Sequence, residues 1–136
     1  MADQAYWWTQ ELAEAAPPDP LAAGTPVLDG FYLARQCEGD EALERELLGL
    51  FAAQAQVLCA ALRATSDSPK AAADLAHRLK GAAAAVGAAR VAAHAAWLEN
   101  LGRRGPGARP GMADAVAPLE RAVADACALI ATRLAA

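Results

Sequence analysis

Aromatic residues make up only 5% of the 136 residues, and β-branched residues are sparse as well. Both classes are enriched in strands, so their scarcity argues against a core built from β-sheet. Alanine supplies much of the 56% hydrophobic content and favours helix strongly, although each buried alanine removes little surface from water. The composition therefore predicts an all-α fold, and the length suits one domain with a substantial core.

Cysteine is also scarce, and the charge is nearly balanced. Cys37, Cys59 and Cys127 are odd in number and widely spaced, which favours reduced thiols in a cytoplasmic protein and gives no metal-ligand pattern. The net charge of −4 argues against nucleic acid or an anionic membrane as a partner. The N-terminus has no basic segment before an apolar run, so we expect no signal peptide. Charged residues interrupt the alanine tracts, so we expect no membrane span.

Proline and glycine divide the chain into segments with helical periodicity. Helices are predicted at about 3–16, 29–36, 40–65, 69–86, 88–102 and 112–134, and the prolines at 17–20 end the first of them. Asp29, Asp40 and Ser68 are the expected N-caps, and Gly87 is the expected left-handed residue after a helix. Pro118 either kinks the last helix or marks its beginning.

Four long helices joined by short turns predict an antiparallel four-helix bundle over residues 28–136. Residues 1–27 would form an extension with a short helix and a proline-rich linker, and the short N-terminal helices would cover one end of the bundle. Tyr6, Trp7 and Trp8 are interpreted as a cap over that end, with a partner-docking patch as the alternative. The starting methionine favours a chain that acts alone, and we expect a monomer.

Apolar residues at helical spacing predict which face of each helix points inward. The expected inward residues are Leu28, Phe31 and Leu33; Leu43, Leu47, Leu50, Gln54, Leu58 and Ala61, with Phe51 and Leu62 at the margin; Leu75, Leu79, Ala82 and Val86; Val91, His94, Leu98 and Leu101; and Leu119, Val123, Ala126, Ile130 and Leu134. Glu99 and Arg103 would lie on the outward side. His94 is thus predicted to be a core residue, whereas His77 lies opposite the inward stripe of its helix and is predicted to face solvent.

Gln54 is the polar member of an otherwise apolar stripe. A buried amide needs hydrogen-bond partners, or it costs on the order of 1–3 kcal/mol. It could bond to backbone or water at an end of the bundle, or it could orient another side chain. Periodicity alone favours neither reading.

The surroundings of His77 suggest an accessible nucleophile. Lys80 lies one turn further on the same side of the helix and could offset the charge of an anionic group on the ring. Gly81 follows in the helix interior, where glycine costs about 0.5–1 kcal/mol relative to alanine. Close approach of another molecule to the imidazole would explain a glycine in this otherwise alanine-rich segment.

The segment His77-Arg-Leu-Lys80-Gly81, followed by Gly87, resembles the H-x-x-K-G-x5-G core of histidine-containing phosphotransfer (HPt) domains. The resemblance covers about residues 28–103. It includes Leu28-Asp-Gly-Phe, Gly39-Asp-Glu, Glu46-Leu-Leu-Gly-Leu-Phe, Arg90-Val and Leu98-Glu. The final helix fits by position only.

The resemblance implies a phosphocarrier in a two-component phosphorelay that uses no ATP and no cofactor of its own. His77 would accept a phosphoryl group from a receiver-domain aspartate and pass it to another receiver, whose acidic pocket would hold Mg²⁺. Lys80 would help neutralise the group, and Gly81 would leave room for the partner. Gln54 matches a glutamine that orients the active histidine in some members. That pairing requires the two helices to share a groove. Arg103 matches a supporting arginine.

The chain departs from the family pattern at two places. Glu99 stands where some members have glutamine, which argues against a direct contact with phosphate because like charges repel. Ala82 and Ala83 follow the Lys-Gly pair where many members have serine. The alternative function is a degenerate bundle of this family that serves as a non-catalytic adaptor for a signalling partner. Lys80 and Gly81 argue against that alternative.

Overall fold

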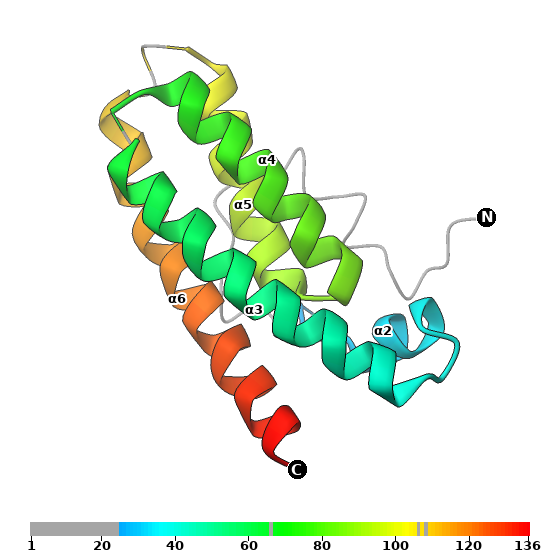
Figure 1. The fold of residues 1–136 in the computed structure, drawn as a ribbon. Helices are drawn as coiled ribbons and strands as arrows, with labels where there is room; N and C mark the ends of the chain where they lie inside the picture. The colour runs from blue at the N-terminus through cyan, green and yellow to red at the C-terminus, as the bar shows by residue number, and fades with distance from the viewer. Residues whose placement is uncertain (1–24, 66, 106, 108) are drawn as a thin grey trace, which may run out of the picture.

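The computed structural model describes residues 25–65, 67–105, 107 and 109–136. This part of the chain contains the helices α2 (Gly30–Gln36), α3 (Glu41–Ala64), α4 (Pro69–Val86), α5 (Ala89–Arg103) and α6 (Arg109–Ala135). Consecutive long helices run in opposite directions, and α6 returns to pack on α3 (Figure 1). The all-α four-helix bundle is thereby confirmed. The helix predicted at 3–16 and the Tyr6-Trp7-Trp8 cluster lie outside the described residues.

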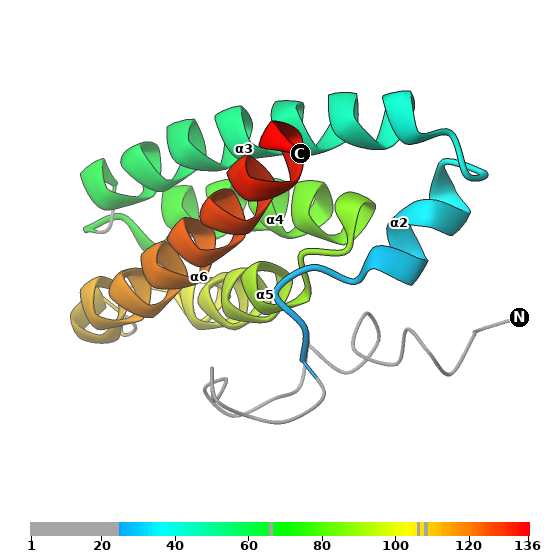
Figure 2. The same ribbon diagram turned by 90° about the horizontal axis from the view of Figure 1, so that it is seen from below.

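The short helix α2 covers one end of the bundle, where it contacts α3 and α4 (Figure 2). The backbone amide of Asp29 donates to the carbonyl of Gly87 at 2.7 Å and joins α2 to the end of α4. Gly87 has φ +77°, and a Cβ there would lie 2.8 Å from the Asp29 carbonyl oxygen. Glycine is therefore required at this turn both by its backbone conformation and by the close approach of α2.

Most helix boundaries follow the predicted capping residues. Asp29 accepts a hydrogen bond from the Tyr32 amide, and Asp40 accepts one from the Leu43 amide, each at 3.0 Å. Ser68 occupies the N-cap position of α4, but its side chain makes no capping bond. Helix α6 begins at Arg109 rather than near residue 112, so Pro118 lies inside it and does not mark its beginning.

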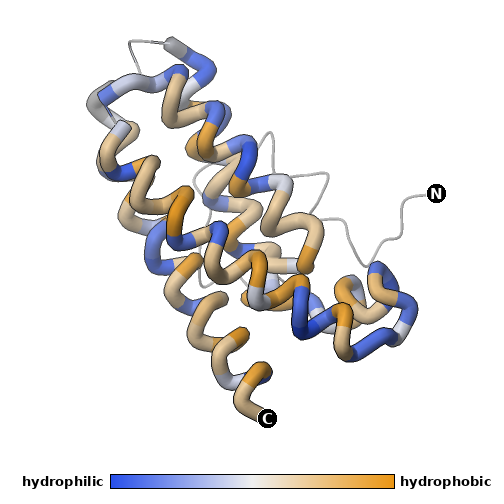
Figure 3. Tube along the Cα trace, viewed as in Figure 1, coloured by the Kyte–Doolittle hydropathy of each residue, from blue (hydrophilic) through white to orange (hydrophobic). Residues whose placement is uncertain are grey.

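The predicted inward face of α3 is correct only in part, since Leu58 is buried and Leu47 is partly buried against the core, whereas other members of the predicted stripe are exposed. Its buried residues are Glu44, Leu48, Phe51, Ala55, Leu58, Cys59 and Leu62. Leu43 and Leu50 are 38% and 61% exposed, and Gln54 is exposed too. Apolar residues occur on every turn of this helix (Figure 3), so its sequence offers more than one apolar stripe. The bundle buries the stripe that includes Phe51, which had been placed at the margin.

The same apolar character affects the membrane prediction. By length and composition alone, α3 is apolar enough to cross a membrane, and a third of the relevant window is buried in the bundle. The expectation that no segment resembles a membrane span is therefore wrong for α3. The core helix of a soluble bundle passes the same test, so the finding is weak evidence for a membrane location.

The remaining helices follow their predicted faces more closely. Leu79, Val86, Val91, Leu98, Leu119, Val123, Ala126 and Ile130 are all buried, while Leu75, Ala82, Leu101 and Leu134 are partly buried. In α2, Leu33 is buried, but Phe31 is 83% exposed and was wrongly placed inward. Leu33 is the buried residue within this short helix, and Cys37 at its C-cap is buried as well.

Helices α4 and α5 pack more extensively than any other described pair. Alanine is the commonest buried residue in both helices, and its small side chain permits close packing. At Gly102 the contact is closer still, because a Cβ there would lie 2.5 Å from the Pro69 carbonyl oxygen and 2.9 Å from the Ala73 Cβ. Gly102 therefore fixes how closely these two helices approach.

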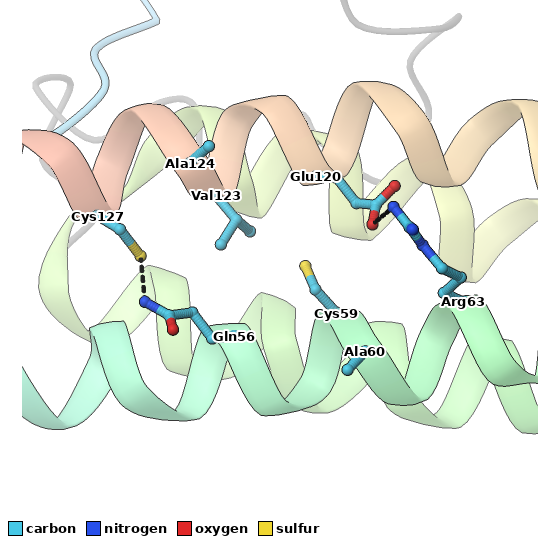
Figure 4. A pocket seen from close by; sticks show the side chains of 8 residues that line it. All are labelled: Gln56, Cys59, Ala60, Arg63, Glu120, Val123, Ala124 and Cys127. Atoms are coloured by element: carbon cyan, nitrogen blue, oxygen red, sulfur yellow. Dashed lines mark hydrogen bonds and ion pairs between the residues drawn. The ribbon is translucent and has the colours of Figure 1, made fainter.

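A shallow groove between α3 and α6 is lined by Gln56, Cys59, Ala60, Arg63, Glu120, Val123, Ala124 and Cys127. An ion pair between Arg63 and Glu120 spans it at one end, and Gln56 Nε2 donates to Cys127 Sγ at 3.8 Å at the other (Figure 4). Burial raises the pKa of the Cys59 thiol to about 11. This thiol therefore stays protonated at neutral pH and is a poor nucleophile.

The contact at Gly102 predicts a difference between two glycine substitutions. Gly102→Ala should lower the free energy of unfolding by about 1–3 kcal/mol, because the new methyl group meets backbone rather than a flexible side chain. Gly81→Ala should be neutral or stabilising by up to about 1 kcal/mol, because a Cβ there meets nothing within 4 Å. Urea unfolding of the two variants measures both effects. Equal stability would contradict the role given to Gly102.

Buried His94 predicts a pH-dependent stability. The residue is 2% exposed, and burial, helped by the charge of Arg121, lowers its pKa. The folded state therefore favours neutral His94, and this contribution to stability is lost as the pH falls below about 6.5, by up to about 1.4 kcal/mol per unit. Unfolding measured between pH 5 and 7.5 should show a shallower slope for His94→Leu than for the parent protein. An unchanged slope would assign the dependence to other groups.

Candidate functional site

His77 lies on the exposed side of α4, and 62% of its side chain is open to solvent. Its Nδ1 atom lies 2.9 Å from Oε2 of Glu99, on α5. Because an ionised carboxylate only accepts hydrogen bonds, the shared proton belongs to Nδ1 when the ring is neutral. The lone pair of the neutral ring is then on Nε2, which has no partner among the described residues. The prediction that His77 faces solvent is confirmed.

Glu99 is the centre of the site. Its Oε1 atom pairs with Lys80 Nζ at 2.7 Å, and its Oε2 atom lies 3.4 Å from Arg103 Nη2 in addition to His77. The same guanidinium pairs through Nη1 with Asp74 Oδ1 at 2.9 Å. Only 12% of the Glu99 side chain is exposed, against 46% for Arg103. A nearly buried carboxylate thus joins one histidine and two cations from two helices.

The predicted outward placement of Glu99 is wrong, and the reason is the close contact of α4 and α5. That contact brings the first half of α4 against the second half of α5, so a residue on the flank of α5 is covered by its neighbour. Sequence reasoning also missed Asp74, which precedes His77 by one turn. The four-residue spacing of Glu99 and Arg103 could have predicted their ion pair, since residues four apart lie on one face of a helix.

The surrounding cations set the ionisation of Glu99. Burial raises the pKa of its carboxyl, but contact with Lys80, followed by His77, outweighs burial and holds this pKa below its ordinary value. Glu99 is therefore ionised at neutral pH. A buried carboxylate at this position is stable only because cations accompany it.

Lys80 and Gly81 lie where the sequence placed them. The Lys80 side chain is 32% exposed and remains within reach of solvent, and its ammonium group pairs with the carboxylate that also contacts His77. Gly81 is exposed, with nothing within 4 Å of the position of its missing Cβ. No packing constraint from the described residues therefore requires glycine at this position.

Gln54 does not lie on the inward face predicted for it. It is exposed on α3, whereas His77 directs Nδ1 toward α5. Helix α4 contacts both α3 and α5, and its histidine is on the α5 side. Glu99, and not Gln54, is therefore the side chain that contacts Nδ1 of His77. Arg103 does reach the site, through Glu99 and Asp74.

The described residues contain no group of three or more histidine, cysteine or acidic side chains suited to a metal ion. What the site offers is an exposed imidazole nitrogen, a fixed tautomer and two cations within one cluster. Such a site suits nucleophilic transfer of an anionic group.

Comparison with known families agrees with this chemistry. The model of the Hpt domain family matches residues 42–133, which includes nearly all of α3 to α6. The chain belongs to the Hpt domain family. No curated protein matches the chain, and neither does any solved structure. The match also includes α6, which the sequence resemblance reached by position only. Hpt domains are phosphocarriers that act in histidine phosphotransfer and interact with receiver domains in two-component signalling.

The contact between His77 and Glu99 predicts the tautomer of the ring. In the neutral Hpt protein, ¹⁵N NMR should show His77 protonated on Nδ1, because Glu99 accepts that proton. In Glu99→Ala the acceptor is lost, and the ring should shift toward the Nε2-protonated form that a free histidine favours. His94 provides the internal reference in the same spectra. An Nε2-protonated His77 in the unmodified chain would contradict the assigned contact.

Proposed function

We propose that His77 accepts a phosphoryl group from the phosphoaspartate of one receiver domain and passes it to the aspartate of another. The observation that supports this most strongly is the pairing of an exposed imidazole with a nearly buried carboxylate. Glu99 fixes the proton on Nδ1 and leaves Nε2 as the nucleophile. With Nδ1 facing Glu99, Nε2 is directed to the exposed surface of α4, which a partner can reach.

The transfer itself requires positioning and charge neutralisation more than acid–base catalysis. The three oxygens of a phosphoryl group on Nε2 would carry negative charge close to α4. Lys80 is one helical turn from His77 and would turn its ammonium group toward these oxygens. Arg103, held between Glu99 and Asp74, is a second cation close to the ring and has the supporting role.

Gly81 provides clearance in this proposal. It lies one turn beyond His77 on the exposed side of α4, where a receiver must approach to bring its aspartate in line with Nε2. The open space around its Cβ position supports a steric role toward the partner. The chain acts as a phosphocarrier without kinase activity of its own.

The phosphoacceptor is tested by incubating the chain with a phosphorylated receiver domain. The protein should become labelled at His77 with acid-labile, base-stable phosphate. His77→Ala should abolish the labelling without loss of helix content, because the side chain is outside the core. His94→Ala is the matched control: it should lower stability by about 1–3 kcal/mol and leave transfer by the folded protein intact. A His77→Ala protein that still becomes labelled, or an unmodified chain that binds receivers without labelling, would support the adaptor alternative.

The charge role of Lys80 and the steric role of Gly81 can be distinguished by changing the size of the phosphodonor. Gly81→Gln should fold and should slow transfer from a receiver far more than phosphorylation by phosphoramidate, because only the large donor meets the added side chain. Lys80→Ala should slow both reactions, because it removes a charge that stabilises the transferring group. Normal transfer from a receiver to Gly81→Gln would contradict the clearance argument.

A further inference from the structure

Glu99 brings a full negative charge to a position beside the proposed phosphoacceptor. A glutamine there would accept the same Nδ1 hydrogen bond without charge, so orienting the ring does not require a carboxylate. The carboxylate is also costly to bury, and it occupies Lys80 and Arg103, the cations that a phosphoryl group needs. The charge of Glu99 therefore calls for a role of its own.

We propose that Glu99 keeps phosphorylated His77 protonated on Nδ1 and so makes the phosphohistidine a readily discharged intermediate rather than a store. The proposal rests on the proposed function, since it concerns the product formed on His77. In this role Glu99 is a positioning residue that acts through the imidazole ring.

The Nδ1 proton decides how readily the phosphoryl group leaves His77. When Nε2 attacks the phosphoaspartate, an Nε2–P bond forms and the bond from phosphorus to the aspartyl oxygen breaks, with its electron pair left on the carboxylate. The ring then carries a positive charge and still holds its Nδ1 proton. If that proton stays, a second aspartate can attack phosphorus and expel a neutral imidazole. If the proton is lost to water, the leaving group would be an imidazolate, which leaves far less readily.

The arrangement of charges favours retention of that proton. The Nδ1 proton points at an ionised carboxylate that is mostly shielded from solvent, so the attraction to an imidazolium is weakly screened. Lys80 and Arg103 oppose this effect in the unmodified protein, because they neutralise Glu99, and Asp74 shares Arg103. A phosphoryl group on Nε2 competes for both cations. As they turn toward it, Glu99 is left to stabilise the protonated ring.

The experiment compares discharge of the phosphorylated full chain over pH 6–9. Each protein is phosphorylated with phosphoramidate and freed of donor, and loss of phosphate from His77 is followed in buffer and after addition of a receiver domain. Glu99→Gln retains the size and the hydrogen-bond acceptor of the side chain. Its discharge should decline at a pH at least one unit lower than in the unmodified chain, with a half-life near neutral pH that is roughly tenfold longer. Asp125→Asn, which removes a carboxylate from the exposed side of α6 and outside the site, is the charge-matched control and should keep the parent profile.

The outcomes separate this inference from the proposed function. Phosphate found on a residue other than His77 would overturn the proposed function itself. Labelling at His77 with the same pH profile in Glu99→Gln would overturn only the role of Glu99, and so would an equal shift in Asp125→Asn. If Glu99→Gln fails to fold, ¹⁵N NMR of the phosphorylated unmodified chain decides. Nδ1 must stay protonated to a higher pH than in phosphohistidine within a peptide of residues 75–81, and equal titration would overturn the inference.

Discussion

The contact of α4 with α5 at Gly102 is the constraint on which the site depends. Glycine at this point lets the backbone of α5 approach the Pro69 carbonyl and the Ala73 side chain. Glu99 precedes Gly102 by three residues, so the same contact brings its carboxylate beside α4 at the level of His77. A larger residue at position 102 would separate the helices and open Glu99 to water. The ion pairs would then be screened, and the ring would lose its fixed tautomer.

This dependence explains how an exposed histidine, the proposed nucleophile, is held in place. A histidine on a solvent-facing helix surface would ordinarily sample several rotamers and both tautomers. Here one nitrogen is fixed by a carboxylate that is itself fixed by Lys80 and Arg103. The fixed part of the site is therefore the interface between the two helices, and the Nε2 edge of the imidazole faces outward. The other helices support this pair from outside: α2 and α3 pack on α4, and α6 packs on α5.

Features that depend on one helix alone could be predicted from the sequence. The outward position of His77, the burial of His94 and the left-handed turn at Gly87 depend on local periodicity and backbone conformation, and all three are confirmed. The Hpt family could also be named from the motif around His77. The exposed face of α3 could not be predicted, because alanine and leucine occur on several of its faces. Only the packed bundle selects the face that includes Phe51.

The partner of His77 was mispredicted for a different reason: Gln54 was expected, and Glu99 makes the contact. The partner of His77 depends on which neighbouring helix flanks its side of α4, and periodicity within one helix carries no such information. In the structure the glutamine on α3 is exposed, and the glutamate on α5 contacts the histidine. The close approach at Gly102 favours α5, and this contact is encoded by the small residues of the two helices rather than by the polar residues of the site.

The charge balance of the site shows why the glutamate matters. The cluster around the imidazole contains two cations, Lys80 and Arg103, and two carboxylates, Glu99 and Asp74, so it is neutral when His77 is neutral. A phosphoryl group on Nε2 adds two negative charges, and a proton retained on Nδ1 returns one positive charge. With glutamine at position 99, the same cluster would begin with one positive charge and would hold the phosphoryl group more firmly. By lowering that affinity, the carboxylate moves the balance of the proposed relay toward the receiver that takes the group next.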